Sequence, residues 1–176
     1  MSKVTICIGS ASDADDLAAF AARTFAETFA ADNRPEVLQG LMCATFSAER
    51  QAKELADPSV TTILARSDGE LIGYAQVRRS VPPPCVTHAD PIELHRFYLD
   101  KQAQGSGLAS ELMLAVHEAA EEFGAQHIWL GVWERNPRAI AFYQKTGFCD
   151  VGSTIYMVGP DRQTDRVMVT AVRKAP

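Results

Sequence analysis

The chain has 176 residues, 47% of them apolar, a proportion that suits a globular domain with a full hydrophobic core. Its net charge of −5 argues against a nucleic-acid partner, because such binding requires a basic surface that neutralises phosphates. No apolar run approaches membrane-spanning length, and the N-terminal segment lacks a signal-peptide layout. We therefore expect one cytoplasmic domain over residues 1–176 that binds neither nucleic acid nor membrane.

The cysteines and histidines are scattered along the chain and form no metal-binding pattern. No two cysteines have C-x-x-C spacing, so we expect reduced thiols rather than a disulfide framework or a zinc site. The histidines are equally dispersed, and the sequence therefore predicts no metal site. The residues concerned are Cys7, Cys43, Cys85, Cys149, His88, His95, His117 and His127.

The N-terminal third predicts one strand followed by helices. Residues 3–9 are rich in β-branched side chains, which is typical of a strand. Ser12 and Asp15 match a capping box at the start of a helix with apolar side chains at helical spacing. A second helical region is expected over 35–56, with a restart at Ser47.

Strands, a loop and a helix follow in the middle of the chain. Residues 61–79 predict two strands joined by a tight turn at Asp68-Gly69. Three successive prolines indicate a loop over 81–91, because proline neither continues a helix nor donates to a sheet ladder. A strand is expected at 92–99, and a helix from about 106 to 123.

The C-terminal part alternates strand and helix before two closing strands. A strand is expected at 127–133, a short helix within 136–148, and strands near 149–158 and 165–173. This order of elements predicts an α/β protein with a mixed sheet and helices on both faces.

The loop before the helix at 106–123 carries two glycines around a serine, Gly105-Ser106-Gly107. Loop amides and first-turn N–H groups at such a junction point outward together, and the helix dipole adds positive charge, so the loop suits an anion. An ordinary strand-to-helix turn explains the glycines equally well. Ser110 stands where a dinucleotide fingerprint needs its third glycine, and no G-K-S/T sequence supports a P-loop.

Three segments in order resemble the GNAT superfamily of acyl-CoA-dependent N-acetyltransferases. QGSGLA at 104–109 resembles the Q/R-x-x-G-x-G/A signature, NPRAIAFYQKTGF at 136–148 resembles the second motif, and ELHRFYL at 93–99 resembles the strand before the signature. The resemblance covers roughly residues 60–174. It implies the GNAT fold, with a mixed, mostly antiparallel sheet of about seven strands. It also implies acetyl-CoA as donor, its pyrophosphate held by the loop amides of Gln104, Gly105, Ser106, Gly107, Leu108 and Ala109.

Acetyl transfer to an amine needs an acid that protonates the departing thiolate. In the GNAT family this acid is typically a tyrosine of the second motif, and the matching residue is Tyr143. A phenol is neutral at pH 7 and can donate a proton. The alternative is that Phe142 and Tyr143 are core aromatics of an amphipathic helix.

The same reaction needs a base that removes the proton of the amine. Relatives often carry a carboxylate at or near the positions of Glu93 and His95. Strict strand alternation places both on one face with Phe97 and Leu99. The choice between Glu93 and His95 stays open, and each residue is also explained as a solvated or hydrogen-bonded strand residue.

Four further residues are expected beside the cofactor. The resemblance implies that the backbones of Phe97 and Leu99 pair with the pantetheine arm, because this strand splays from the next one in relatives. Asn136 matches a helix N-cap and could also reach the cofactor. Lys145 either reaches the cofactor or is a solvated charge.

The acceptor is the least constrained part of the prediction. Residues 157–169 and 24–36 resemble bacterial GNAT members that acetylate spermidine and spermine, and the acidic balance suits a cationic amine. The first helices and the 81–91 loop are expected to wall its site. Acetylation of a protein N-terminus or lysine, and a non-catalytic acyl-CoA-binding module, are the alternatives. A homodimer is kept open as the assembly.

Overall fold

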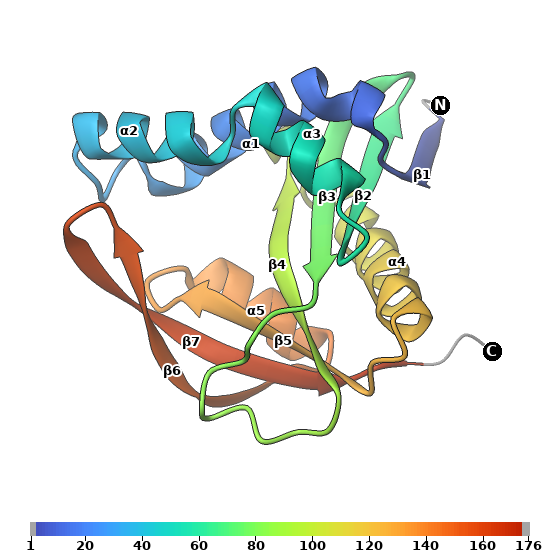
Figure 1. The fold of residues 1–176 in the computed structure, drawn as a ribbon, viewed down its shortest axis with the longest axis vertical. Coiled ribbons are helices and arrows are strands. Elements are labelled where there is room, and N and C mark those ends of the chain that lie inside the picture. Colours follow the sequence, from blue (N-terminus) through green and yellow to red (C-terminus); the bar gives the residue numbers. More distant parts are fainter. Residues whose placement is uncertain (1–2, 174–176) are drawn as a thin grey trace.

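In the computed structural model, which describes residues 3–173, seven strands form one sheet in the order β1-β2-β3-β4-β5-β7-β6. Neighbouring strands are antiparallel except β4 and β5, which are parallel. Figure 1 shows the strong twist of this sheet from β1 to the β6–β7 hairpin. The strands are β1 (Val4–Ile8), β2 (Val60–Ser67), β3 (Glu70–Arg78), β4 (Pro91–Leu99), β5 (His127–Trp133), β6 (Cys149–Val158) and β7 (Asp161–Ala171).

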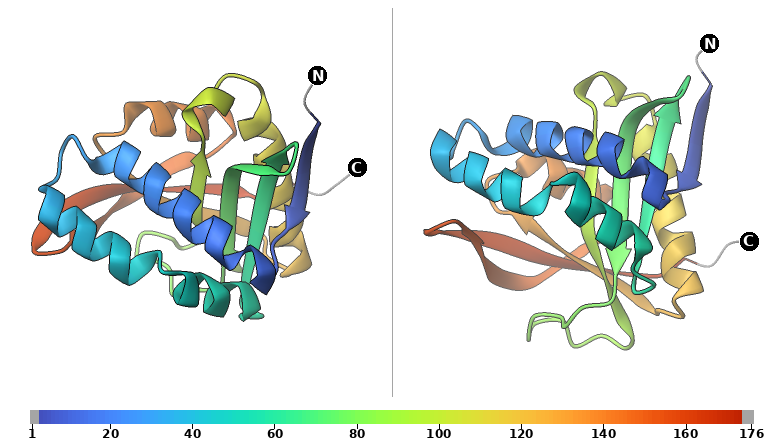
Figure 2. Two further views of the ribbon diagram at one scale, coloured as in Figure 1. Left: turned by 90° about the horizontal axis from the view of Figure 1, so that it is seen from above. Right: turned by 45° about the horizontal axis from the view of Figure 1, so that its top comes forward.

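Helices cover both faces of the sheet, as the sequence predicts. α1, α2 and α3 lie on one side, and α4 and α5 lie on the other (Figure 2). The α-helices are α1 (Ala14–Phe29), α2 (Pro35–Thr45), α3 (Ala48–Ala56), α4 (Leu108–Glu122) and α5 (Pro137–Lys145), and short 3-10 turns occur at Ala11–Asp13 and Lys101–Ala103. The predicted mixed, mostly antiparallel seven-stranded architecture is confirmed.

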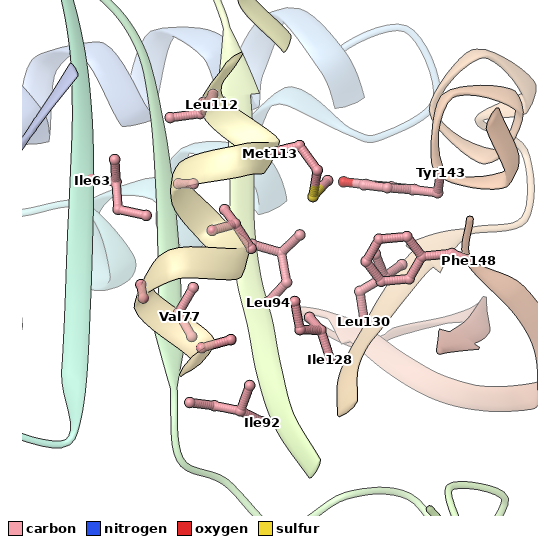
Figure 3. Packing of buried hydrophobic residues seen from close by; sticks show 14 of the residues in the cluster. Ile63, Val77, Ile92, Leu94, Leu112, Met113, Ile128, Leu130, Tyr143 and Phe148 are labelled. Atoms are coloured by element: carbon pink, nitrogen blue, oxygen red, sulfur yellow. The ribbon is translucent and has the colours of Figure 1, made fainter. Parts of the chain in front are cut away.

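Two hydrophobic clusters hold these layers together. The larger cluster packs α4 and α5 on the sheet, with Leu112, Leu94 and Tyr143 among its members (Figure 3). The second cluster packs α1 and α2 on the opposite face, around Phe25 and Tyr74. The helices bury their apolar faces on opposite sides of one sheet. Side chains therefore pack against both faces of β4.

Most predicted element boundaries lie within two residues of the observed ones, and three predictions need correction. The capping box is made by Ser10 and Asp13, whose carboxylate accepts from the Ser10 N–H at 2.8 Å, and not by Ser12 and Asp15. The helix expected from 106 begins at Leu108, because Gly107 has a positive φ of 94°. β7 begins four residues before the predicted 165, because Val158 and Asp161 already pair across a tight hairpin.

A β-bulge at His95 interrupts β4. Gln76 pairs with Arg96 and Val77 pairs with Leu94, so β3 has no residue opposite His95. An extra residue reverses the alternation beyond it, because side-chain direction has a period of two. The prediction that Glu93 shares a face with Phe97 and Leu99 is therefore wrong.

The consequence of the bulge is visible in the packing on the two faces of β4. Phe97 packs against the α4–α5 cluster, together with Leu94. Arg96 instead bonds Glu54 of α3, and Tyr98 stacks on Tyr74 beneath α1. The bulge thus brings Glu93 onto the same side as Arg96 and Tyr98.

Candidate active site

A cavity of about 720 Å³ opens where β4 and β5 separate. The two strands pair only through Pro91–Glu93 and His127–Trp129. Within the described residues, β4 beyond Glu93 has a strand partner on its β3 side alone. An extended ligand can add to such an edge through main-chain hydrogen bonds.

The loop before α4 closes one end of this cavity with free backbone donors. Gly105 and Gly107 have φ values of 85° and 94°, which other residues adopt only with strain. Within residues 3–173, the amides of Gly105, Gly107 and Ala109 donate to no other residue. A Cβ added at either glycine meets no atom within 4 Å, so the space outside the loop is open to a ligand. Free donors at a helix N-terminus suit a phosphate.

Most predicted cofactor residues line this cavity. They are Phe97, Leu99, Gln104, Gly105, Gly107, Ala109, Asn136 and Lys145. Two predicted residues do not line it. The Ser106 hydroxyl donates to the Ala103 carbonyl at 2.6 Å and accepts from the Leu108 N–H, and the Leu108 side chain is buried in the protein. Their side chains therefore shape the loop.

Asn136 and Lys145 lie at opposite ends of α5. The Asn136 side chain accepts from the Ala139 N–H at 3.2 Å, which agrees with the predicted N-cap. Lys145 is in the last turn and exposed, with Thr146 and Arg173 beside it on the cavity wall. A cation at this helix end is favourable with or without a ligand.

Tyr143 lies on α5 and faces the same cavity. It is 8% exposed and packs against Phe97, Phe142 and Phe148, with ring centroids 5.5–6.3 Å apart. Figure 3 shows its hydroxyl pointing toward Met113 of α4. Burial raises the pKa of Tyr143 well above its ordinary value, so the phenol keeps its proton at neutral pH. Tyr143 is thus a core aromatic that keeps a protonated phenol on the wall of the cavity.

A second cavity of about 460 Å³ joins the first on the α1–α2 side of β4. Phe29, His95 and Gly131 line both cavities, so the two meet at the fork between β4 and β5. The second cavity is also lined by side chains of α1, α2, β6 and β7 and by residues 81–84 of the proline-rich loop. The first helices and the proline-rich loop thus wall a cavity on this side of β4, and its use as the acceptor site stays a prediction.

Glu93 and His95 form a hydrogen-bonded pair with Arg78 at this junction. His95 Nδ1 lies 3.2 Å from a Glu93 carboxylate oxygen, and Arg78 binds the same carboxylate at 2.6 and 3.3 Å. Burial raises the pKa of Glu93, but the His95 hydrogen bond and Arg78 outweigh it and lower the pKa to about 2. A carboxylate that resists protonation is a weak base.

His95 is the better base of the two. Burial lowers its pKa, and the Glu93 hydrogen bond only partly opposes this effect, so the imidazole is neutral at pH 7. With Nδ1–H donating to Glu93, Nε2 carries the lone pair. Within the described chain no residue bonds Nε2, which leaves it available to a substrate.

Sequence reasoning missed Asp165, which lies on β7 and lines the second cavity. Burial, together with the charge of Glu134, raises the pKa of Asp165 to about 6. Its position within an alternating strand resembled that of any solvated acidic residue, so no sequence signal distinguished it. Elsewhere, no three His, Cys, Asp or Glu side chains within residues 3–173 gather as a metal site.

The residues that line the two joined cavities suit acyl transfer. Free amides suit a pyrophosphate, the open edge of β4 suits an amide-containing arm, and the neutral imidazole of His95 and the phenol of Tyr143, which can accept and donate a proton, line the first cavity. The residues present therefore fit acetyl-CoA.

Comparisons with known proteins agree with a site for acetyl-CoA. The model of the Acetyltransferase (GNAT) family matches residues 22–148, and the chain belongs to this family. It is an acetyl-CoA-dependent N-acetyltransferase. An uncharacterized N-acetyltransferase of Mycobacterium tuberculosis is 38% identical over 157 residues, which cover 89% of this chain and 96% of that protein. Another uncharacterized N-acetyltransferase, from Lactobacillus delbrueckii, is 32% identical over 174 residues, which cover 98% of this chain and 99% of that protein.

Two further likenesses are a distant one in structure and a partial one in sequence. The PaiA N-acetyltransferase of Thermoplasma acidophilum in complex with coenzyme A has the same fold, with a TM-score of 0.75 at 20% identity, covering 96% of this chain and 99% of that one. The spermine/spermidine N(1)-acetyltransferase of Bacillus subtilis is 30% identical over 82 residues, which cover 46% of this chain and 54% of that protein. No helix within residues 3–173 is long and apolar enough to cross a membrane.

Proposed function

We propose that this enzyme acetylates a primary amine of a small cationic acceptor of the polyamine class, with His95 as base and Tyr143 as general acid. The observation that carries this proposal is the junction of the two cavities at the β4–β5 fork, with His95 at the junction and Tyr143 on the wall of the first cavity. The partial likeness to a spermine/spermidine acetyltransferase supports the acceptor class.

The residues divide the proton transfers between them. Bound acetyl-CoA supplies the thioester carbonyl that the amine attacks. His95 Nε2 takes the proton that the amine loses, and Glu93 holds the ring through Nδ1. Tyr143, whose phenol is protonated at neutral pH, donates its proton to the departing thiolate. The products are an acetamide and free coenzyme A thiol.

Direct transfer from thioester to amine needs no covalent enzyme intermediate. All four cysteines have free thiols, and none of them lines the first cavity, where the thioester is expected to lie. A thiol nucleophile must contact the reacting carbonyl. Free thiols also support the proposed cytoplasmic location.

A panel of amines tests the proposal. Spermidine, spermine, simple diamines, lysine and short peptides are each incubated with acetyl-CoA and enzyme, and acetylated products are identified by mass spectrometry. We expect acetylated polyamines or diamines, together with stoichiometric release of free thiol. A clear preference for peptide N-termini or lysine side chains would mean that the acceptor is a protein and not a polyamine. Failure to acetylate any amine despite tight coenzyme A binding would instead favour a binding module.

A further inference from the structure

The charged groups lining the second cavity are paired, with one exception. Glu93 is bound to Arg78, and Arg96 is bound to Glu54 at 2.6 Å and lies over the Phe46 ring at 5.0 Å. Asp165 has no side-chain hydrogen bond or ion pair to any residue in the described part of the chain. The cavity is thus left with one uncompensated carboxylate.

The strands around Asp165 leave its carboxylate open on one side. Its backbone lies between Trp133 of β5 and Thr154 of β6. A Cβ added at Gly131 would lie 3.3 Å from an Asp165 carboxylate oxygen, so glycine at that position leaves room beside the carboxylate. The neighbouring charge that acts on it is Glu134, which is also negative. Arg78 and Arg96 line the same cavity but are bound to Glu93 and Glu54, and no cation within residues 3–173 pairs with Asp165.

Leaving this carboxylate unpaired is costly. Burial and Glu134 raise its pKa to about 6, so at neutral pH the group is mostly ionised in surroundings that disfavour its charge. Such a group is common at functional sites, where a ligand of opposite charge relieves the cost.

Aromatic rings form much of the wall of the cavity that Asp165 lines. An ammonium group is attracted to ring faces, and the alkyl chain of an amine packs against them. The rings come from several elements and are Phe25, Phe29, Phe46, Tyr98, Trp129, Trp133 and Tyr156. A cavity that combines one unpaired carboxylate with aromatic rings suits an alkylammonium ion, because the carboxylate attracts the charge and the rings contact the alkyl chain.

We propose that Asp165 binds an ammonium group of the acceptor other than the one acetylated, so that the enzyme selects amines carrying a second positive charge. The inference rests on the proposed function. The reacting nitrogen must reach the fork at His95, which lines both cavities. Asp165 lines only the second cavity. It would therefore contact the end of the acceptor that is remote from the reacting nitrogen.

Matched acceptors test this assignment. Diamines with three to six carbons are each compared with a monoamine of equal length, such as 1,4-diaminobutane with 1-aminopentane, in which a methyl group replaces one ammonium. For the preferred length we expect the parent enzyme to favour the diamine about 10- to 100-fold in kcat/KM, the usual effect of one ionic interaction in a binding site. Asp165→Asn should abolish this preference and leave the KM for acetyl-CoA unchanged.

A matched control removes another carboxylate of the same strand. Asp161 is exposed and pairs with Arg34 at 3.5 Å, outside both cavities. Asp161→Asn should keep the full preference for diamines. Equal use of diamines and monoamines by the parent enzyme, or a preserved diamine preference in Asp165→Asn, would overturn the inference.

A binding measurement separates this inference from the proposed function. Near pH 6, a cation that pairs with Asp165 should drive its proton off, so diamine binding to the complex with coenzyme A releases more protons in the parent than in Asp165→Asn. Calorimetry in buffers of different ionisation enthalpy measures the release. The other charged or titratable groups that line this cavity are Arg78, Glu93, His95, Arg96, Tyr98 and Tyr156, the charge of Glu134 acts on Asp165 from outside the lining, and both proteins share all of them. Equal proton release overturns the role of Asp165 whether or not any amine is acetylated.

Discussion

The ring and the hydroxyl of Tyr143 can be tested separately. Its ring contributes to the α4–α5 cluster, while its hydroxyl is the group that the proposed mechanism uses. We expect Tyr143→Phe to lower turnover by about 10²–10⁴-fold, the usual contribution of general acid catalysis. Acetyl-CoA affinity and thermal stability should change little, since the ring remains. Single-turnover rates and calorimetric binding measure the two effects.

Tyr74→Phe is the matched control for this change. Tyr74 is buried in the other cluster, and its hydroxyl has no hydrogen-bond partner within the described chain. Removing an unpaired buried hydroxyl should leave activity unaltered and stability equal or higher. If turnover of Tyr143→Phe stays within about twofold of the parent when chemistry limits the rate, the acid lies elsewhere.

The pair of Glu93 and His95 predicts a pH effect of definite sign. In the proposed mechanism neutral His95 is the active form, so we expect the rate to fall as pH drops through its pKa, which burial holds below the ordinary value. Glu93 raises that pKa, so Glu93→Gln should move the acidic limb of the kcat profile to lower pH, with a loss of about tenfold from a poorly held ring.

The double variant tests whether the two residues act as one unit. His95→Gln should cost about 10²–10⁴-fold and remove the acidic limb. Adding Glu93→Gln to it should cost little more, because a positioning residue has nothing left to position. A double variant far slower than His95→Gln would mean that Glu93 also acts as a base.

At the scale of elements, the loop between β4 and α4 depends on backbone conformation. Gly107 has a φ of 94°, and the space where its Cβ would lie is open. We expect Gly107→Val to fold with a stability loss of about 1–3 kcal/mol from backbone strain. Coenzyme A affinity should fall at least about tenfold, because the side chain and altered backbone disturb the amide donors of the loop.

Gly69→Val separates strain from binding. Gly69 lies in the β2–β3 turn at a φ of 92°, also with open space around its Cβ, and it lines neither cavity. Its variant should lose similar stability and keep the full coenzyme A affinity. Chemical denaturation and calorimetric titration compare the two variants. An unchanged affinity in folded Gly107→Val would remove the loop from the cofactor site.

For the whole molecule, Asp165 predicts a conflict between stability and function. Its folded pKa, about 6, lies above the ordinary value of 3.8, so the stability linked to this group is full below about pH 4 and is lost as pH rises through 6. Asp165→Asn cannot ionise, so the variant does not lose this stability as pH rises. We expect the variant to be more stable than the parent at pH 7–8 by about 1 kcal/mol, since water screens a partly exposed carboxylate.

Denaturant unfolding at several pH values measures this difference. The gain should shrink toward pH 4, where Asp165 is protonated in the folded parent, and acceptor use should fall although stability rises. A variant less stable than the parent at pH 8 would indicate that the carboxylate is compensated in the folded protein.

Features that depend only on neighbouring residues could be predicted from the amino-acid sequence. Asp68-Gly69 specifies its hairpin and Asn136 caps α5, because turns and caps are made within a few residues of the chain. Gly105 and Gly107 marked the loop that must adopt positive φ. The family motifs pointed to the cofactor, and most of their residues line one cavity.

The pairing of charges around the second cavity depends on contacts between segments that are far apart in the sequence. The bulge at His95 arises from pairing with β3, and it turns Glu93 toward Arg78 rather than toward Phe97. Arg96 finds Glu54, 42 residues away, while Asp165 finds no partner among the described residues. Such pairings join distant segments through space, and the pKa of each group depends on them and on burial. The pattern of neighbouring residues therefore carried no signal that distinguished a neutralised carboxylate from a free one.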